Sequence, residues 1–227
     1  MLVFLMTASG ANTRANPVPI CNSQTTATSK LFCLIYEREQ LMKNVAAYKY
    51  LQQRSSYAST QELKVLLFAG VEAKSHGLPV TDVQLYSQIL MDISKQIQEY
   101  WFTYWREHKQ TPVALPSLAQ IRQQIQEIDE NIIVSFVQIR DNNSFRFKQE
   151  LEDGIKKSLA QLDGISPAEE PELFINMLVK VIWSITNSVG DCPQKPPNRV
   201  KLGFLTPIDS TQGQIIPQYP SIHHPKP

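Results

Sequence analysis

The sequence predicts an all-α fold, a single-domain bundle of about six helices followed by a Pro-rich C-terminal tail. Apolar residues recur at helical spacing from about residue 28 to residue 189. No alternating pattern typical of a strand interrupts them, and turn-forming residues such as Gly77 and Pro79 separate the segments. At 227 residues, the chain is long enough to bury one sizeable core.

Start and stop signals divide this pattern into elements. Ser59, with Glu62 in the first turn, predicts an N-cap and a helix start, and Gly77 is expected to cap the end of the same helix. The segment 112–116 contains two prolines and ends the third helix before Ser117 begins the fourth. The expected helices lie at about 28–53, 59–75, 81–106, 117–140, 144–162 and 168–188.

The first residues predict export. Met1 to Met6 are almost wholly apolar, and small residues follow, with Ser9 and Ala11 placed as residues before a cleavage site. We therefore expect a partial signal peptide and leader at 1–20 and a secreted or periplasmic protein. The segment is short and has no basic residue before the apolar run, so a cytoplasmic location is the alternative.

The end of the chain differs in composition from the helical domain, which we expect at 21–192. Eight of the fifteen prolines fall within 193–227, so that this tail cannot form regular helix. Cys21 and Cys192 flank the domain and could pair in an oxidising compartment. Cys33 lies on the apolar side of the first helix and is expected to be a small buried residue, although the sequence leaves the pairing open.

Composition excludes several classes of function. The formal net charge is +1 without a basic block, which argues against nucleic acid as a partner. The eight glycines form no phosphate-binding loop, and the four His and three Cys show no metal-ligand spacing. We expect no metal and no cofactor. We expect Trp101, Trp105 and Trp183 to pack between helices.

Arg38 and Lys49 are the first candidates for a functional site. They lie eleven residues apart on one apolar-patterned segment, which is close to three helical turns, so both return to nearly the same face. Two cations on a core-facing side are costly unless an anion accompanies them. The alternative is two solvated side chains whose stems lie along the helix.

The segment from Leu31 to Gln98 resembles the secreted, all-helical (gamma) class of chorismate mutases. The matching pieces are Arg38 in LIYEREQLM, Lys49 in NVAAYKYL, Glu62 in TQELKVLL, Gly77-Leu78, and the run Ser94 to Gln98. The stretch LAQIRQQIQEIDENII, which contains Arg122, is similar to the first helix of dimeric chorismate mutases. The resemblance implies the helical fold of that family, with a monomer or a homodimer as its assembly.

The resemblance also implies a function, the isomerisation of chorismate to prephenate in aromatic amino acid biosynthesis. It assigns Arg38 and Arg122 to the substrate carboxylates, Lys49 with Gln98 to the ether oxygen, and Glu62 to the hydroxyl. Ser94 and Gln98 stand four residues apart on one helical face and can point at one ligand. Chorismate would be the partner, with no nucleic acid and no membrane for the mature protein.

The sequence departs from the family at two positions. The family places an arginine where this chain has Gln61, which can still hydrogen-bond a carboxylate but brings no charge. Some members use an arginine where this chain has Asn131, and Lys64 or Arg54 are candidates to compensate. The alternative function is therefore a low-activity or inactive relative that serves as a secreted binding protein. In that case Glu62, Gln98 and Arg122 are ordinary surface residues and Ser94 bonds its own helix.

Overall fold

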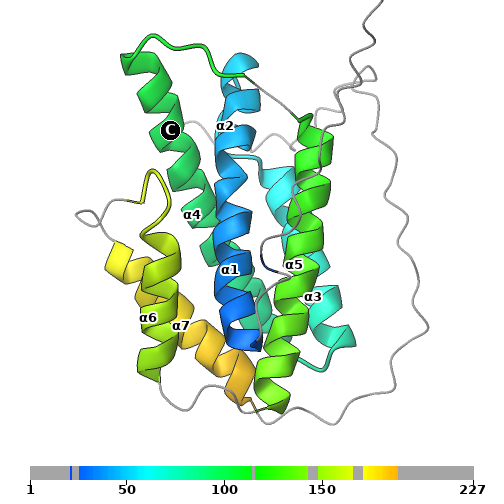
Figure 1. Ribbon diagram of the computed structural model, residues 1–227. Helices are drawn as coiled ribbons and strands as arrows, with labels where there is room; N and C mark the ends of the chain where they lie inside the picture. Colours follow the sequence, from blue (N-terminus) through cyan, green and yellow to red (C-terminus); the bar gives the residue numbers. More distant parts are fainter. Residues whose placement is uncertain (1–20, 22–25, 114–115, 143–147, 166–170, 189–227) are drawn as a thin grey trace, which may run out of the picture. The chain divides into compact units, whose positions relative to one another are not determined.

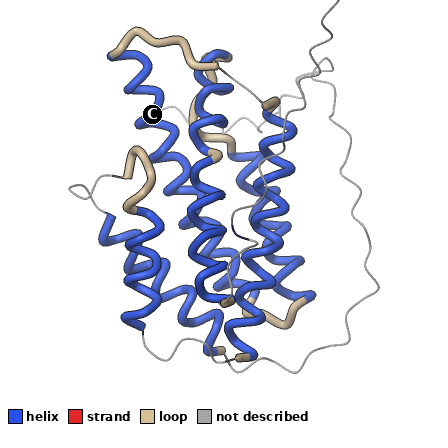
Figure 2. The backbone as a smooth tube through the Cα atoms, in the orientation of Figure 1, coloured by secondary structure: helices blue, strands red, loops and turns tan. Residues whose placement is uncertain are grey.

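The computed structural model describes residues 21, 26–113, 116–142, 148–165 and 171–188, and these residues form seven α-helices and no strand (Figure 1, Figure 2). The helices are α1 (Ala27–Gln40), α2 (Met42–Leu51), α3 (Ser59–Ser75), α4 (Val80–Glu107), α5 (Leu118–Asp141), α6 (Lys148–Leu159) and α7 (Pro171–Asn187). The all-α prediction is confirmed. The expected leader, 1–20, and the expected tail, 193–227, lie outside the described residues. Within the described residues, no helix combines the length and apolarity that a membrane span requires.

The helix ends follow local signals, with one correction. Helix α3 begins at Ser59, but its N-cap is Ala58, whose N–H donates to Glu62 Oε1 at 3.2 Å. Ser117 caps α5 through a reciprocal pair of bonds with the third helical residue, as its sequence suggests. Gly77 adopts a left-handed φ of +61° after α3, a conformation that a residue with a Cβ reaches only at a cost.

The predicted first helix is two helices in the structure. Helices α1 and α2 are separated by Leu41, which keeps right-handed helical angles, φ −64° and ψ −18°. Figure 1 shows α2 following α1 along nearly the same line. A one-residue interruption of this kind leaves the apolar periodicity intact, and for that reason the pattern could not reveal it. Arg38 and Lys49 consequently stand on different helices.

Helix α4 is the longest element and packs against α2, α3 and α7. Helix α5 lies against α1 and α7, with further contacts to α2 and α3 (Figure 1). The buried residues of α4 repeat at three- and four-residue spacing, which is typical of an amphipathic helix. They include Val83, Tyr86, Ile89, Leu90, Ile93, Ser94, Ile97, Gln98 and Trp101. The apolar stripe of α4 therefore carries two polar residues, Ser94 and Gln98, into the interior.

The disulfide joins Cys21 to Cys33, a pairing that the sequence leaves open beside Cys21–Cys192. The two Cα atoms are 5.5 Å apart, at a separation of 12 residues. The Cys21 N–H also donates to Glu37 Oε1 at 3.2 Å, which holds the residue against α1. Cys33, expected to be a small buried residue, is only partly buried and forms the disulfide. Sequence spacing does not determine connectivity, because three cysteines allow three pairings. Cys192 lies outside the described residues.

We predict that Cys33→Ser lowers the free energy of unfolding by about 2–4 kcal/mol, because closing a loop of this size restricts the unfolded chain. Urea unfolding of the oxidised protein provides the measurement. Cys192→Ser is the matched control and is expected to leave stability unchanged. Equal destabilisation by the two substitutions, or by neither, would contradict the Cys21–Cys33 pairing.

Candidate functional site

Arg38, near the C-terminal end of α1, lies inside the bundle with its guanidinium fixed by three groups. Its Nε donates to Asp129 Oδ1 of α5 at 2.8 Å, and its Nη1 donates to Glu39 Oε1 at 2.5 Å and to Ser94 Oγ of α4 at 2.9 Å. Within the described residues, Nη2 has no hydrogen bond. The guanidinium is therefore held in one orientation and keeps an NH₂ group for a further acceptor.

Burial and charge act in opposite directions on this group. Burial disfavours the charge of Arg38, but Asp129 and Glu39 outweigh that effect and raise the pKa of Arg38. Burial raises the pKa of Glu39, and the hydrogen bonds and charge of Arg38 and Ser94 oppose this shift. Burial also raises the pKa of Asp129, and there Arg38 opposes the shift. The Asp129 side chain is 18% exposed and that of Glu39 is fully buried, so the desolvation is more severe at Glu39. Since two carboxylates outnumber the single positive charge of Arg38, this residue offers an anionic ligand a directed hydrogen bond and no net attraction.

Ser94 and Gln98 link this group to the next turn of α4. Ser94 Oγ donates to Glu39 Oε2 at 2.8 Å while it accepts from Arg38. Gln98 Nε2 donates to the Ser94 carbonyl at 2.9 Å and approaches Met42 Sδ at 3.8 Å. Gln98 Oε1 is buried without a partner in the described residues. An unpaired buried oxygen is costly, so Gln98 has unused capacity as an acceptor, while one of its two N–H groups is bound only to a weak sulfur acceptor.

Lys49, in the last turn of α2, is buried, with 7% of its surface exposed. Its Nζ donates to the carbonyl oxygen of Ser56 at 2.5 Å. Burial, together with the positive charge of Arg122, lowers the pKa of Lys49 to about 8, although Glu62 and Glu99 oppose the shift. Lys49 is a partly desolvated cation beside a second cation, and a bound anion would stabilise its charged form.

Glu62 and Gln61 stand at the start of α3. Glu62 Oε2 accepts from Lys95 Nζ of α4 at 3.3 Å, while Oε1 accepts the Ala58 N–H. Lys95 also contacts Asp92 and lies 5.0 Å from the centroid of the Tyr57 ring. Gln61 is half-buried beside Glu62, and its side chain makes no hydrogen bond to the described residues.

Arg122, on the first turns of α5, is an exposed residue whose charge nevertheless reaches Lys49. Partial burial lowers the pKa of Arg122, with Tyr48 opposing the shift and Arg54 adding to it. Arg54 follows α2 and is thus a neighbouring cation. Asn131, two turns further along α5, donates to the carbonyl oxygen of Glu127 at 2.8 Å and is exposed.

The structure thus brings the sequence-derived candidates into two groups. Arg38, Ser94 and Gln98 form a hydrogen-bonded chain through α1 and α4. Lys49, Glu62 and Arg122 interact electrostatically at the end of α2. Within the described residues, no side-chain hydrogen bond or ion pair ties Gln61 to either group. Three cations from three helices, together with the hydroxyl of Ser94 and the amide of Gln98, supply the kinds of donor that suit a small dianion.

Sequence reasoning missed two members of this arrangement, Glu39 and Asp129. Glu39 directly follows Arg38 and falls on the apolar side of the helix, which was a usable signal because buried carboxylates are rare without a partner. Asp129 lies 91 residues from Arg38, and only the packing of α5 on α1 brings them together. It stands in the stretch IQEIDENII, where apolar residues surround the acid.

In the described residues, one group of side chains places its potential metal-ligand atoms as close together as a metal site requires. Cys21, Cys33 and Glu37 place their ligand atoms within 4.8 Å of one another. The two sulfur atoms are joined in the disulfide, however, and metal binding by cysteine requires thiolates. The group is therefore explained by the disulfide.

Comparison with known proteins points to one enzyme family. A monofunctional chorismate mutase from Enterobacter agglomerans is 32% identical over 102 residues, which cover 45% of this chain and 56% of that protein. The chain thus spans little more than half the length of this curated relative. The crystal structure of a chorismate mutase from Burkholderia thailandensis matches with a TM-score of 0.52 and 17% identity, over 70% of this chain and 98% of that one. The structural likeness shows a shared fold. No protein-family model matches the chain.

The lowered pKa of Lys49 predicts a pH-dependent stability. Between about pH 8 and pH 10.5 the unfolded chain holds a proton at Lys49 that the folded protein lacks, so the free energy of unfolding rises with pH in this window. Relative to Lys49→Met, wild type is expected to gain up to about 3 kcal/mol between pH 7 and pH 10.5 in urea unfolding. The exposed Lys74, substituted in the same way, serves as the control. Parallel pH profiles for wild type and Lys49→Met would show that Lys49 titrates normally.

Proposed function

We propose that this protein is a chorismate mutase, of the secreted gamma class, which isomerises chorismate to prephenate. The observation that carries the proposal is the environment of Lys49, a buried cation whose pKa is lowered by burial and by the charge of Arg122. The identity to the Enterobacter agglomerans enzyme and the fold shared with the Burkholderia thailandensis enzyme support the same activity.

The chemistry suits these residue types. Chorismate is a dianion that rearranges by a concerted [3,3] shift, in which a C–O bond breaks as a C–C bond forms. The reaction needs no covalent intermediate, metal or cofactor. An enzyme accelerates it by holding both carboxylates in a chair-like geometry and by stabilising the charge that develops on the ether oxygen.

Lys49 and Gln98 are the proposed partners of the ether oxygen. The ammonium of Lys49 supplies charge in a desolvated position, where electrostatic stabilisation is stronger than in water. One N–H of Gln98 donates to Ser94 O and the other to Met42 Sδ at 3.8 Å, and the ether oxygen would replace the sulfur, which is the weaker acceptor. An amide donates at any pH, so Gln98 introduces no requirement for acid, unlike a carboxyl group, which would have to be protonated first.

Arg38 and Arg122 are the proposed carboxylate ligands. The free Nη2 of Arg38 is oriented by Asp129 and Glu39, an arrangement that reduces the entropy lost on binding. Arg122 is more exposed and can move to meet the second carboxylate. Glu62, held by Lys95 and the start of α3, would accept the hydrogen bond of the substrate hydroxyl.

Gln61 would be a neutral substrate ligand where the family has an arginine. Both cations that could replace the missing charge, Arg54 and Lys64, are exposed, and Arg54 is favoured because its charge acts on Arg122. The rival function, an inactive relative that serves as a binding protein, rests on this same substitution. The two proposals differ in one measurable quantity, the rate of chorismate consumption.

We predict that the purified protein accelerates the loss of chorismate absorbance and that Lys49→Ala lowers kcat/KM by at least about 10²–10³, as expected when a transition-state donor is removed. Lys74→Ala, an exposed lysine on α3, is the matched control and should retain the wild-type rate. A wild-type rate equal to that of the uncatalysed reaction would exclude the enzyme and favour the binding protein. Equal rates for wild type and Lys49→Ala would place the chemistry elsewhere.

The same assay tests the missing charge. Gln61→Arg is expected to increase kcat/KM, since a charge-assisted hydrogen bond is roughly twice as strong as a neutral one. Adding Arg54→Gln to that variant should cost less activity than Arg54→Gln costs in wild type, because the new arginine supplies the charge. An unchanged rate in Gln61→Arg would mean that other cations already satisfy the carboxylate.

We also propose export of the protein, for which the Cys21–Cys33 disulfide provides support. Structural disulfides persist in oxidising compartments and are rare in a reducing cytoplasm. The apolar run at the start of the chain favours the same location. Fractionation of the native cells is the test, and recovery of the protein in the cytoplasm with reduced Cys21 would overturn export.

A further inference from the structure

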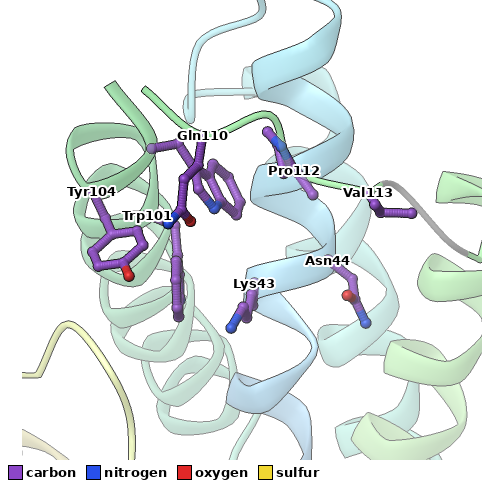
Figure 3. A pocket seen from close by; sticks show the side chains of 9 residues that line it. Lys43, Asn44, Trp101, Tyr104, Gln110, Pro112 and Val113 are labelled. Carbon is purple, nitrogen blue, oxygen red and sulfur yellow. The ribbon is translucent and has the colours of Figure 1, made fainter. Parts of the chain in front are cut away.

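A cavity separate from the proposed catalytic site lies between α2 and the C-terminal part of α4. Its volume is about 300 Å³, at the lower end of the range of about 300–1,000 Å³ found for small-molecule sites. Figure 3 shows the side chains that surround it, with Lys43 extending from α2 toward Trp101 of α4. The lining residues are Lys43, Asn44, Ala47, Trp101, Tyr104, Trp105, Gln110, Pro112 and Val113. None of them belongs to the proposed mutase site.

The polar groups of this cavity are all potential donors to a ligand. Lys43 Nζ lies 3.7 Å from the centroid of the Trp101 ring, and no carboxylate of the described residues forms an ion pair with it. The side-chain amides of Asn44 and Gln110 have no hydrogen-bond partner in that part of the chain, and no acidic residue lines the cavity. A cation and two amides without an opposing carboxylate are suited to an anion.

The walls are aromatic and already in place. Trp101 and Trp105 are buried to more than nine-tenths, at 7% and 5% exposure, and their ring centroids are 5.5 Å apart. Tyr104 lies 5.2 Å from Trp101, centroid to centroid. The expected role of the two tryptophans in helix packing accounts for their burial. Lys43 Nζ covers the Trp101 ring, so a flat ring reaches that indole when Nζ turns toward the ligand's carboxylate.

We propose that this cavity binds a small aromatic carboxylate, whose ring packs against Trp101 and Trp105 and whose carboxylate pairs with Lys43. The amides of Asn44 and Gln110 complete the polar contacts. An aromatic amine or a zwitterionic ligand fits less well, because the cavity offers its ammonium no carboxylate. This inference is independent of the proposed mutase activity.

Tryptophan fluorescence tests the proposal directly, since two of the three tryptophans of the chain line the cavity. In the Trp183→Phe background, 3-phenylpropanoate is expected to change the emission saturably. Phenethylamine, which has the same ring and the opposite charge, is expected to leave it unchanged. Lys43→Gln should weaken binding by about tenfold through loss of the charge-assisted contact.

Lys148→Gln is the matched control, because Lys148 also lies over a tryptophan, at 5.4 Å from the Trp183 ring centroid, but outside the cavity. It should be compared in the background that retains Trp183 and is expected to bind 3-phenylpropanoate as wild type does. Gln110→Ala provides a second variant, with weaker binding expected.

Three outcomes would overturn the proposal. The first is no saturable response to 3-phenylpropanoate, and the second is equal affinity in Lys43→Gln and wild type. The third is loss of binding in Lys49→Ala, which would place the probe in the proposed mutase site. Retained binding in Lys49→Ala, whatever the mutase assay shows, supports a separate site.

Discussion

The buried guanidinium of Arg38 is the constraint on which the rest of the structure depends. It joins α1 to α5 through Asp129 and α1 to α4 through Ser94, while Glu39 bridges Arg38 and Ser94. A charged group in this position is costly unless its donors are satisfied, and any shift of one helix would break one of these bonds. The network therefore fixes the relative position of three helices, and it fixes the direction of the remaining NH₂ group at the same time.

The two ends of the proposed site differ in charge balance, and we therefore expect them to contribute differently to ligand binding. Around Arg38, two carboxylates offset one cation, so this end contributes geometry. Around Lys49 and Arg122, positive charge is in excess and partly desolvated, so this end contributes attraction for an anion. Repulsion between these two cations is relieved when a dianion binds, which makes binding energy available for the reaction.

The sequence predicted the fold well and the candidate site in part. Helical periodicity and end signals such as Gly77 located the helices because they act over a few residues. The eleven-residue spacing of Arg38 and Lys49 placed both cations on the interior, although the break at Leu41 was invisible in the pattern. The contact of Asp129 with Arg38 depends on the packing of α5 against α1, so no local pattern could show it. The cavity beside Trp101 likewise forms only where two helices and a connection meet.

A crystal structure with a bicyclic dicarboxylate ether, which mimics the transition state of the [3,3] shift, tests the central claim most directly. The account predicts one carboxylate within hydrogen-bonding distance of Arg38 Nη2, with the bonds of Arg38 to Asp129 and Glu39 retained. It also predicts the ether oxygen beside Lys49 Nζ and Gln98 Nε2. An analogue bound away from Lys49, or an Arg38 that leaves both carboxylates to reach it, would contradict the account.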